Sequence, residues 1–414
     1  MKKAVKVLAA LIITLCSMTS VWAKDKDLYA SAPKEVRERI AAADKFIADK
    51  QYGSANGALG ADDSEYIILK RTELVTRYFV YSLMHQIFVI KNLDPDEDLM
   101  ELRKMASYGS ETQTYAMTYW DPVDVITGYA EEHGMSPALQ LALGHYYYDT
   151  LMRYGNNWLE STRAMIRKSS ENFDAAFKAG FYDKSYLDEY AELLINKQDY
   201  KTACSVLEKS VSLVSDDARA WFNYAVAALY AEKLDTAVTA AKNAIKYKDP
   251  DPDYDLDAYL LLIDIYKQKN DTTNVNKTIQ QAKKAYPDKA LPLLYEGHEY
   301  NTNGNTEKAT ECFVKAYQLD ESDSVLKRAI DSYYMYKMID PAISFCEQCI
   351  EFKADDGNKR SMLWYMIFQL YLSNGDRTAA EDAITKAEQS LAEATDAAYA
   401  RQTFKEVRES FDFD

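Results

Sequence analysis

Small and apolar residues recur along the second half of the chain with the spacing of two consecutive helices. The clearest case is 218–248, where Trp221 and Ala225 share one face of a predicted helix. After a short break, Ala237 and Ala241 share one face of a second predicted helix. Residues three or four positions apart lie on the same side of a helix, so the pattern predicts a helix–turn–helix with one buried face. A single hairpin cannot cover that face alone, and it therefore needs neighbours.

Six copies of the hairpin follow one another from 184 to 390. Successive copies are 34, 38, 34, 33 and 38 residues apart, and each long interval contains a polar insert, at Asp249–Asp253 or Asp355–Arg360. The period therefore predicts stacked helix pairs. The second-helix patterns are Ala203–Leu207–Ser210, Ala237–Ala241–Ala244, Val275–Ile279–Ala282, Ala309–Phe313–Ala316, Ala342–Cys346–Cys349 and Ala380–Ile384–Ala387. Twelve positions before them lie the middle residues of the first helices, Ala191, Ala225, Ile263, Gly297, Ile330 and Phe368.

This spacing resembles the tetratricopeptide repeat family, whose signature is W-x2-L-G-x2-Y…A-x3-F…P. Trp221 stands at the leading position of one copy, Gly297 at the glycine position of another, and Pro287 at the closing proline. The resemblance implies an all-α fold, a right-handed superhelical solenoid of helix–turn–helix repeats with an N-terminal helical cap and a C-terminal capping helix.

An earlier segment fits the same signature with a longer spacing. Leu143–Gly144–Tyr147 matches its first half, and Phe173–Phe177–Gly180 is the predicted second-helix pattern. Within the N-terminal region, Tyr66–Lys91 is the longest apolar-periodic run and predicts one buried core helix. The expected regions are a signal peptide at 1–23, an N-terminal helical region at 24–135, an irregular elongated first repeat at 136–183, six repeats at 184–390 and a capping helix at 391–414.

The first 23 residues predict export. A basic start precedes an apolar run too short to span a bilayer, and Val21-Trp22-Ala23 has small residues at the cleavage positions. A lipoprotein anchor through Cys16 is the less favoured alternative, because Leu15 stands where lipoprotein processing needs a small residue. We expect a protein secreted through the Sec route into a bacterial periplasm or beyond, without membrane insertion after signal removal.

The charge of the chain opposes binding to nucleic acid. Its formal net charge is −16, and loss of the three lysines of the signal peptide makes it −19. Such a surface repels phosphate backbones at long range. The chain also has 33 tyrosines, of which Tyr146, Tyr147 and Tyr148 are consecutive and point in different directions around one helix. We expect at least one of these three rings to face solvent or a groove.

No motif for catalysis, a cofactor or a metal is present. The four histidines lack ligand spacing, and neither HExxH, paired CxxC motifs nor a glycine-rich phosphate loop occurs. Cys346 and Cys349 form a CxxC, which in an exported protein is compatible with a redox dithiol. They fall, however, where neighbouring repeats have core residues, and core packing is the favoured interpretation.

Recognition by the repeat surface remains as a function. In the family that the chain resembles, the first helix of each repeat lines the concave side, which implies a peptide-binding groove. Asn223 matches one position of the carboxylate clamp used by chaperone-binding members, but Asp188, Asp257 and Leu261 replace its basic residues, so that partner class is not expected. The predicted groove residues are Phe222, Asn223, Val226, Asp264, Tyr295, His298, Lys327, Arg328, Tyr365 and Gln369.

The pattern favours a non-enzymatic scaffold or adaptor that binds a protein or peptide partner in this groove. Lys327 and Arg328 would then contact an acidic group at one end of the partner. One alternative is a receptor for a small molecule or glycan, or an accessory subunit of an envelope complex, served by tyrosine stacking. Another is an enzyme with its site in 25–132. The sequence leaves open the partner, the pathway and the oligomeric state.

Overall fold

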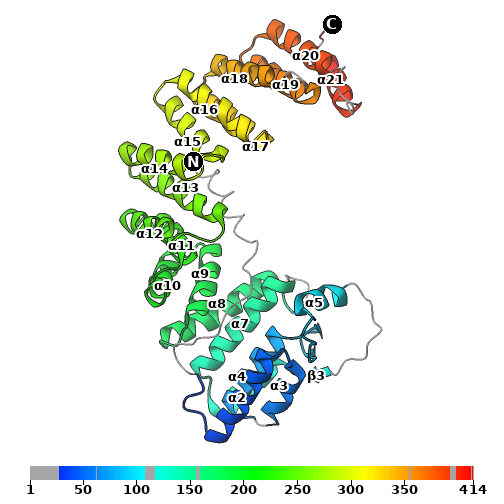
Figure 1. The fold of residues 1–414 in the computed structure, drawn as a ribbon, viewed down its shortest axis with the longest axis vertical. Helices are drawn as coiled ribbons and strands as arrows, with labels where there is room; N and C mark the ends of the chain where they lie inside the picture. Colours follow the sequence, from blue (N-terminus) through cyan, green and yellow to red (C-terminus); the bar gives the residue numbers. More distant parts are fainter. Residues whose placement is uncertain are drawn as a thin grey trace. The chain divides into compact units, whose positions relative to one another are not determined.

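The computed structural model describes residues 28–61, 63–107, 117–154, 159–353, 356–391, 398–411 and 413. Within them the chain is almost entirely helical (Figure 1), which confirms the expected all-α class. The chain divides into two compact units, residues 1–247 and 248–414, which are described separately below. The predicted signal peptide at 1–23 lies outside the described residues. None of the described helices is both long enough and apolar enough to cross a bilayer.

Unit 1 begins with a helical region that also contains a small sheet. Strand β2 pairs antiparallel with β1 on one side and β3 on the other. Phe88 of β2 is buried in the same core as Ile67 and Leu74 of α4. The elements are α2 (Lys34–Ala48), α3 (Tyr52–Leu59), α4 (Glu65–Arg77), β1 (Tyr81–Leu83), β2 (Ile87–Val89), α5 (Leu99–Ser107), β3 (Met117–Tyr119) and α6 (Pro122–His133).

The sheet corrects the prediction of one helix over Tyr66–Lys91. Helix α4 ends at Arg77, and a tight turn at Met84 and His85 joins β1 to β2. Both turn residues have positive φ, 53° and 59°, as a type I′ hairpin turn requires. Glycine and asparagine usually occupy such positions, so Met-His carries no turn signal in the sequence. The apolar run fits a helical period as a whole, and short continuous apolar stretches such as Ile87–Ile90 do not distinguish a buried strand from a buried helix.

Helices α7 (Pro137–Tyr154) and α8 (Thr162–Lys178) form the irregular first pair. A Cβ atom built on Gly144 would lie 2.3 Å from Phe173 Cδ1, so the glycine lets α8 approach α7. The buried pattern on α8 is Ser169–Phe173–Ala176, one turn earlier than the predicted Phe173–Phe177–Gly180, whose last residue is exposed.

The three consecutive tyrosines of α7 are all buried, contrary to the expectation that one faces solvent. Tyr146, Tyr147 and Tyr148 are 3%, 4% and 6% exposed. Their rings point in different directions, but α7 packs against α4, α6, α8 and α9 and is therefore covered on several sides. A helix surrounded in this way has no face left for solvent.

Regular helix pairs complete unit 1 and make up most of unit 2 (Figure 1). Within each unit, a second helix packs against its own first helix and, where a further pair follows, against the next first helix. In unit 1 the pairs are α9 (Lys184–Asn196) with α10 (Tyr200–Leu213) and α11 (Ala218–Tyr230) with α12 (Leu234–Tyr247). In unit 2 they are α13 (Pro252–Gln268) with α14 (Thr272–Ala285), α15 (Ala290–Thr302) with α16 (Thr306–Leu319), α17 (Asp323–Met335) with α18 (Ile339–Phe352), and α19 (Gly357–Ser373) with α20 (Arg377–Leu391).

The core of the pairs is the predicted repeat pattern. All eighteen residues of the six second-helix patterns are at most 2% exposed. Gly297 repeats the device of Gly144, because a Cβ atom there would lie 2.4 Å from Phe313 Cε1. The final helix, α21 (Ala398–Phe411), packs against α20 and buries Phe404 in the core of unit 2.

Many acidic residues of the chain serve as helix N-caps. Asp217 accepts a hydrogen bond from the backbone N–H of Ala220, and Asp271 accepts one from Asn274. An N-cap carboxylate satisfies a backbone donor that the helix leaves open, and it interacts favourably with the positive end of the helix dipole. Part of the negative charge therefore has a local structural role at the turns between helices.

Candidate functional site

The apolar members of the predicted groove lie inside the fold. Phe222 and Val226 of α11 are 5% and 8% exposed. Tyr365 is half-buried, and its ring centroid lies 5.5 Å from that of Phe404 on α21. These three side chains therefore contribute to packing, as apolar helix positions usually do. Asn223 is half-buried and Gln369 is exposed.

The polar members gather on the first helices of unit 2, where side chains from α13, α15 and α17 reach one another. The Tyr295 hydroxyl donates to Asp264 Oδ2 at 3.3 Å, which joins α15 to α13. His298 Nδ1 lies 3.1 Å from Ser332 Oγ, which joins α15 to α17. We call the following residues the α13–α17 strip: Asp257, Asp264, Lys267, Tyr295, His298, Glu299, Arg328 and Ser332.

One cation of the strip is already paired. Lys267 Nζ lies 2.8 Å from Glu299 Oε1, and it also lies 5.2 Å from the centre of the Tyr295 ring. The second contact has the geometry of a cation–π interaction. Burial lowers the pKa of His298, and Lys267 lowers it further, so this imidazole is neutral at pH 7.

Two carboxylates of the strip lack a cation in contact. Among the described residues the side chain of Asp257 makes no hydrogen bond or ion pair, and that of Asp264 accepts only from Tyr295. Burial raises the pKa of each to about 6, and the acidic neighbours Asp253 and Asp251 contribute at Asp257. Lys267 and, more weakly, Arg328 oppose the shift at Asp264, and Arg328 opposes the shift at Asp257. The pKa values show that ionising either group in this setting costs free energy.

Arg328 of the strip and its neighbour Lys327 on α17 are available for contacts with a partner. Lys327 and Arg328 are exposed on α17, and in the part of the chain that the structure describes neither forms a hydrogen bond or ion pair. Of the predicted site residues, the structure therefore brings together Asp264, Tyr295, His298 and Arg328. It adds Asp257, Lys267, Glu299 and Ser332, which the sequence-based prediction did not include.

First helices of unit 1 carry a different set of polar contacts. His145 Nδ1 of α7 lies 2.6 Å from Glu189 Oε2 of α9, and the Tyr148 hydroxyl donates to Glu192 at 2.6 Å. Burial opposes protonation of His145, but the Glu189 carboxylate outweighs it and the pKa of the imidazole is raised. We call His145, Tyr148, Glu189 and Glu192 the α7–α9 cluster.

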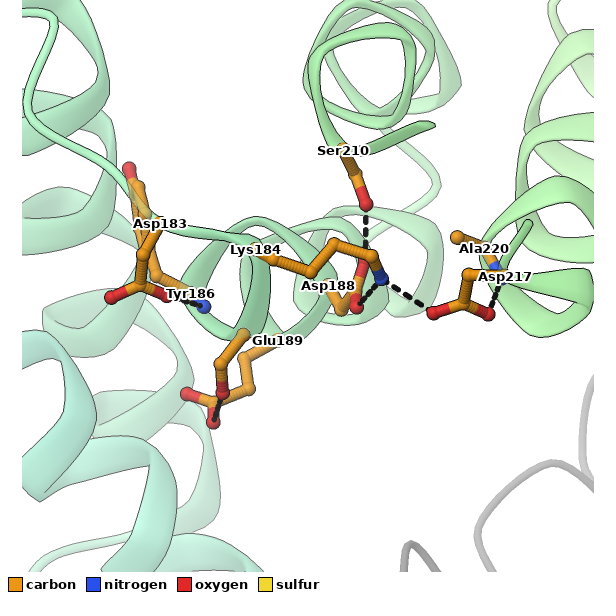
Figure 2. A network of polar contacts seen from close by, with 9 residues as sticks. Asp183, Lys184, Tyr186, Asp188, Glu189, Ser210, Asp217 and Ala220 are labelled. Atoms are coloured by element: carbon orange, nitrogen blue, oxygen red, sulfur yellow. Dashed lines mark hydrogen bonds and ion pairs between the residues drawn. The ribbon is translucent and has the colours of Figure 1, made fainter. Parts of the chain in front are cut away.

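The next contact along unit 1 is a lysine bridge between two repeats (Figure 2). Lys184 of α9 pairs with Asp188 on its own helix and, at 2.6 Å, with Asp217 at the start of α11. Ser210 of α10 donates to Asp188 at 2.5 Å. The carboxylates of Asp188 and Asp217 therefore already have partners inside the fold.

Comparison with known proteins identifies the repeats. A family model described as "Tetratricopeptide repeat" matches residues 296–323, which cover the end of α15, all of α16 and the start of α17. The matched pair contains Gly297 and Phe313, the close contact on which its packing depends. Within residues 296–323 the chain matches the tetratricopeptide repeat family.

Solved structures of tetratricopeptide repeat proteins are similar to this chain at low identity. One from Parabacteroides merdae ATCC 43184 is 13% identical, with coverage of 66% of this chain and 98% of that chain, at a TM-score of 0.40. MamA from Desulfovibrio magneticus RS-1 is 17% identical, with coverage of 44% and 97% at 0.36. YrrB, described as a TPR protein with an unusual peptide-binding site, is 16% identical, with coverage of 45% and 94% at 0.32. The search of curated proteins found no match.

The two cysteines of the CxxC are core residues. Cys346 and Cys349 are both 0% exposed and lie in the core of unit 2. Burial raises the pKa of the Cys349 thiol to about 12 and raises that of Cys346 as well, so neither is a reactive thiolate at pH 7. The core interpretation of the CxxC is confirmed. Among the described residues, no group of three or more His, Cys, Asp or Glu side chains is placed to hold a metal ion.

The residues missing from the sequence-based prediction carried one readable signal. Asp257 and Asp264 are seven positions apart, and Lys267 follows Asp264 by three, so all three share a face of one helix. The sequence-based prediction considered fixed positions of each repeat and therefore did not compare residues along the length of one helix. The pairing of Lys267 with Glu299 joins two helices and depends on the reach of both side chains, which the sequence does not give.

Proposed function

We propose that this protein is a non-enzymatic scaffold that binds a partner polypeptide on the α13–α17 strip. The observation that carries the proposal is charge without an ion pair on the first helices of unit 2, at Asp257 and Asp264 on α13 and at Arg328 on α17. Stacked helix repeats present extended surfaces to their partners. Charged groups that a fold leaves half-buried without partners cost stability and are typical of binding sites.

A glycan or small-molecule receptor is the weaker alternative. Stacking on a sugar needs an open aromatic face, whereas the Tyr295 ring is half-buried and one face is taken by Lys267. Charged and hydrogen-bonding groups dominate the strip, which suits the side chains and backbone of a polypeptide better.

A capture experiment with surface variants tests the scaffold. Full-length mature protein is used to capture partners from an envelope extract, in parallel with Lys327→Glu/Arg328→Glu. The matched control is Lys277→Glu/Lys284→Glu, which makes the same charge change at exposed positions of α14. The proposal expects a partner that the wild type and the control retain and the α17 variant loses. A set of captured proteins identical for all three would overturn it.

We further propose that the scaffold works after export, in the periplasm or outside the cell. The support is the sequence of 1–23, with its basic start, short apolar run and small residues at the cleavage positions. The test is the intact mass and N-terminal sequence of the protein recovered from its native cells. A mature chain beginning at Lys24 is expected, and an uncut chain recovered from the cytoplasm would contradict the proposal.

A further inference from the structure

The two carboxylates of α13 lie on one side of the helix at a defined separation. Asp257 and Asp264 are seven residues apart, close to two full turns, which places them about 10 Å apart along the axis at 1.5 Å per residue. Both are half-buried. That separation is far larger than a single metal ion can bridge, since a calcium ion holds its oxygens at about 2.3–2.6 Å.

No cation among the described residues of unit 2 contacts either carboxylate, although Lys267 lies close enough to Asp264 to lower its pKa. Lys267 is held by Glu299 at 2.8 Å. Lys289 Nζ pairs with Asp253 Oδ1 at 2.8 Å, in the first turn of α13. Arg328 influences both carboxylates but contacts neither. A half-buried carboxylate that has lost water without gaining a cation is destabilised, and a cation supplied from outside removes that cost.

The surroundings of Asp264 show which kind of cation fits. Tyr295 directs its hydroxyl at this carboxylate, and the same ring already carries the Lys267 ammonium at 5.2 Å. Because Tyr295 donates only to Oδ2, the other oxygen of Asp264 can accept from the ammonium of a lysine or the guanidinium of an arginine, whose long alkyl stem lets the charged end reach a half-buried carboxylate.

We propose that the partner docks with basic side chains, a lysine or arginine paired with Asp264 beside Tyr295 and a second one paired with Asp257. This inference rests on the proposed function and names its partner class, a polypeptide segment with two basic residues. A peptide in the polyproline II conformation has three residues per turn and rises about 3.1 Å per residue, so basic residues three positions apart share one face and lie about 9 Å apart, close to the separation of the two carboxylates. The sequence-based expectation of an acidic partner group applies only to Lys327 and Arg328.

Peptide selection tests the proposal directly and does not require the natural partner. A phage-displayed library of random 12-residue peptides is selected on the full-length protein and, in parallel, on Asp257→Asn/Asp264→Asn. Wild-type selection is expected to enrich pairs of Lys or Arg three positions apart, and the variant is expected to lose that enrichment. Peptides with no preference for basic residues, or with the same preference on both proteins, would overturn the proposal.

Charge reversal separates recognition from folding. A selected peptide is expected to bind Asp257→Asn/Asp264→Asn at least tenfold more weakly than wild type, and Glu311→Gln, an exposed change on α16, as tightly as wild type. The same peptide with its basic residues replaced by glutamate is expected to bind Asp257→Lys/Asp264→Lys and not the wild type. Absence of this rescue would overturn the pairing.

The outcomes distinguish this inference from the proposed function. Peptides that lack basic residues and bind wild type but not Lys327→Glu/Arg328→Glu would overturn the pairing of basic residues with Asp257 and Asp264. They would still support the scaffold function. Peptides that bind all variants as tightly as wild type would sink both.

Discussion

The first helices of the two units use polar residues at equivalent positions in opposite ways. His145 and His298 each follow the glycine of their repeat, Gly144 and Gly297. His145 meets the Glu189 carboxylate and its pKa is raised, whereas His298 meets a hydroxyl, lies near Lys267 and has a lowered pKa. The same sequence position therefore holds a histidine that favours the charged form in unit 1 and the neutral form in unit 2.

The carboxylates show the same contrast. Asp188 and Glu189 of α9 contact a lysine and a histidine of the fold. Glu192 has only the Tyr148 hydroxyl, and burial raises its pKa as it does at Asp264, so the contrast rests on Asp188 and Glu189. On α13, among the described contacts, Asp257 has none and Asp264 has one. Paired groups bind the repeats to each other, whereas groups without a cation reduce stability and remain available to a partner. The comparison assigns a structural role to the first strip of charges and a binding role to the second.

The largest expected effect is in the α7–α9 cluster. Glu189→Ala leaves His145 buried without its carboxylate, and removal of one partner of a buried pair costs about 3 kcal/mol. We expect that loss in the free energy of unfolding of unit 1 at pH 6, measured by urea titration with Trp221 fluorescence. A loss below about 0.5 kcal/mol would remove the structural half of the comparison.

This contribution depends on pH with a definite sign. Because the folded state raises the pKa of His145 above its ordinary value of 6.5, the pair contributes fully below that pH. The contribution is lost as the pH rises through the folded pKa. The difference in stability between wild type and Glu189→Ala should therefore shrink from pH 6 towards pH 9, and a difference that grows would contradict the assignment.

In both units a glycine lets an aromatic ring pack against its helix, and replacing that glycine should give the second-largest loss of stability. Gly297→Ala places a Cβ atom 2.4 Å from Phe313, and Gly144→Ala places one 2.3 Å from Phe173. Forcing the rings to move costs about 2 kcal/mol in each case. Gly128→Ala in α6 is the control, because nothing lies within 4 Å of the added atom and alanine favours helix by about 1 kcal/mol. Thermal unfolding of the three variants should give two decreases and one increase in stability.

Loss of the lysine bridge should have a smaller effect. Lys184→Met removes the link between α9 and α11 (Figure 2) but keeps the length of the side chain. Since hydrogen bonds to charged groups contribute about 1.5 kcal/mol, we expect a decrease of that order. Hydrogen exchange should increase at the start of α11, where Asp217 caps the helix, and unchanged exchange there would contradict the bridge.

The smallest effect has the opposite sign. The pKa values of Asp257 and Asp264 are raised to about 6, so these groups stabilise the fold only when protonated, and the contribution is lost as the pH rises from about 4 to about 6. Asp257→Asn/Asp264→Asn should therefore be more stable than wild type at pH 7 by about 1 kcal/mol, after allowance for solvent screening. Its stability should also change less between pH 4 and 7. A variant less stable than wild type would show that the carboxylates support the fold.

The sequence predicted the repeats better than the contacts between them. Small residues such as Ala237 and Ala316 recur at a fixed period, because each must fit a helix crossing, and their positions were readable. The hairpin turn at Met84 and His85 was not, since its positive φ values occur without glycine or asparagine. The α8 pattern was misplaced by one turn, because Phe173 and Phe177 are both aromatic and only the contact with Gly144 distinguishes them.

Only part of the candidate site could be predicted from the sequence, for a related reason. Asp264, Tyr295, His298 and Arg328 were found by their place in the repeat. Burial then removed Phe222 and Val226, whose apolar side chains the sequence could not assign to surface or core. The roles of the charges depend on which cations lie within reach, and that information exists only in the folded arrangement.

Hydrogen exchange tests the division of roles most directly. Backbone exchange of the full-length protein is measured by mass spectrometry with and without a peptide selected on the wild type. The account predicts slower exchange on peptide binding within Pro252–Met335, where the α13–α17 strip lies, and no change within Pro137–Asn196, which contains the α7–α9 cluster. Slower exchange at Pro137–Asn196 without any change at Pro252–Met335 would contradict it.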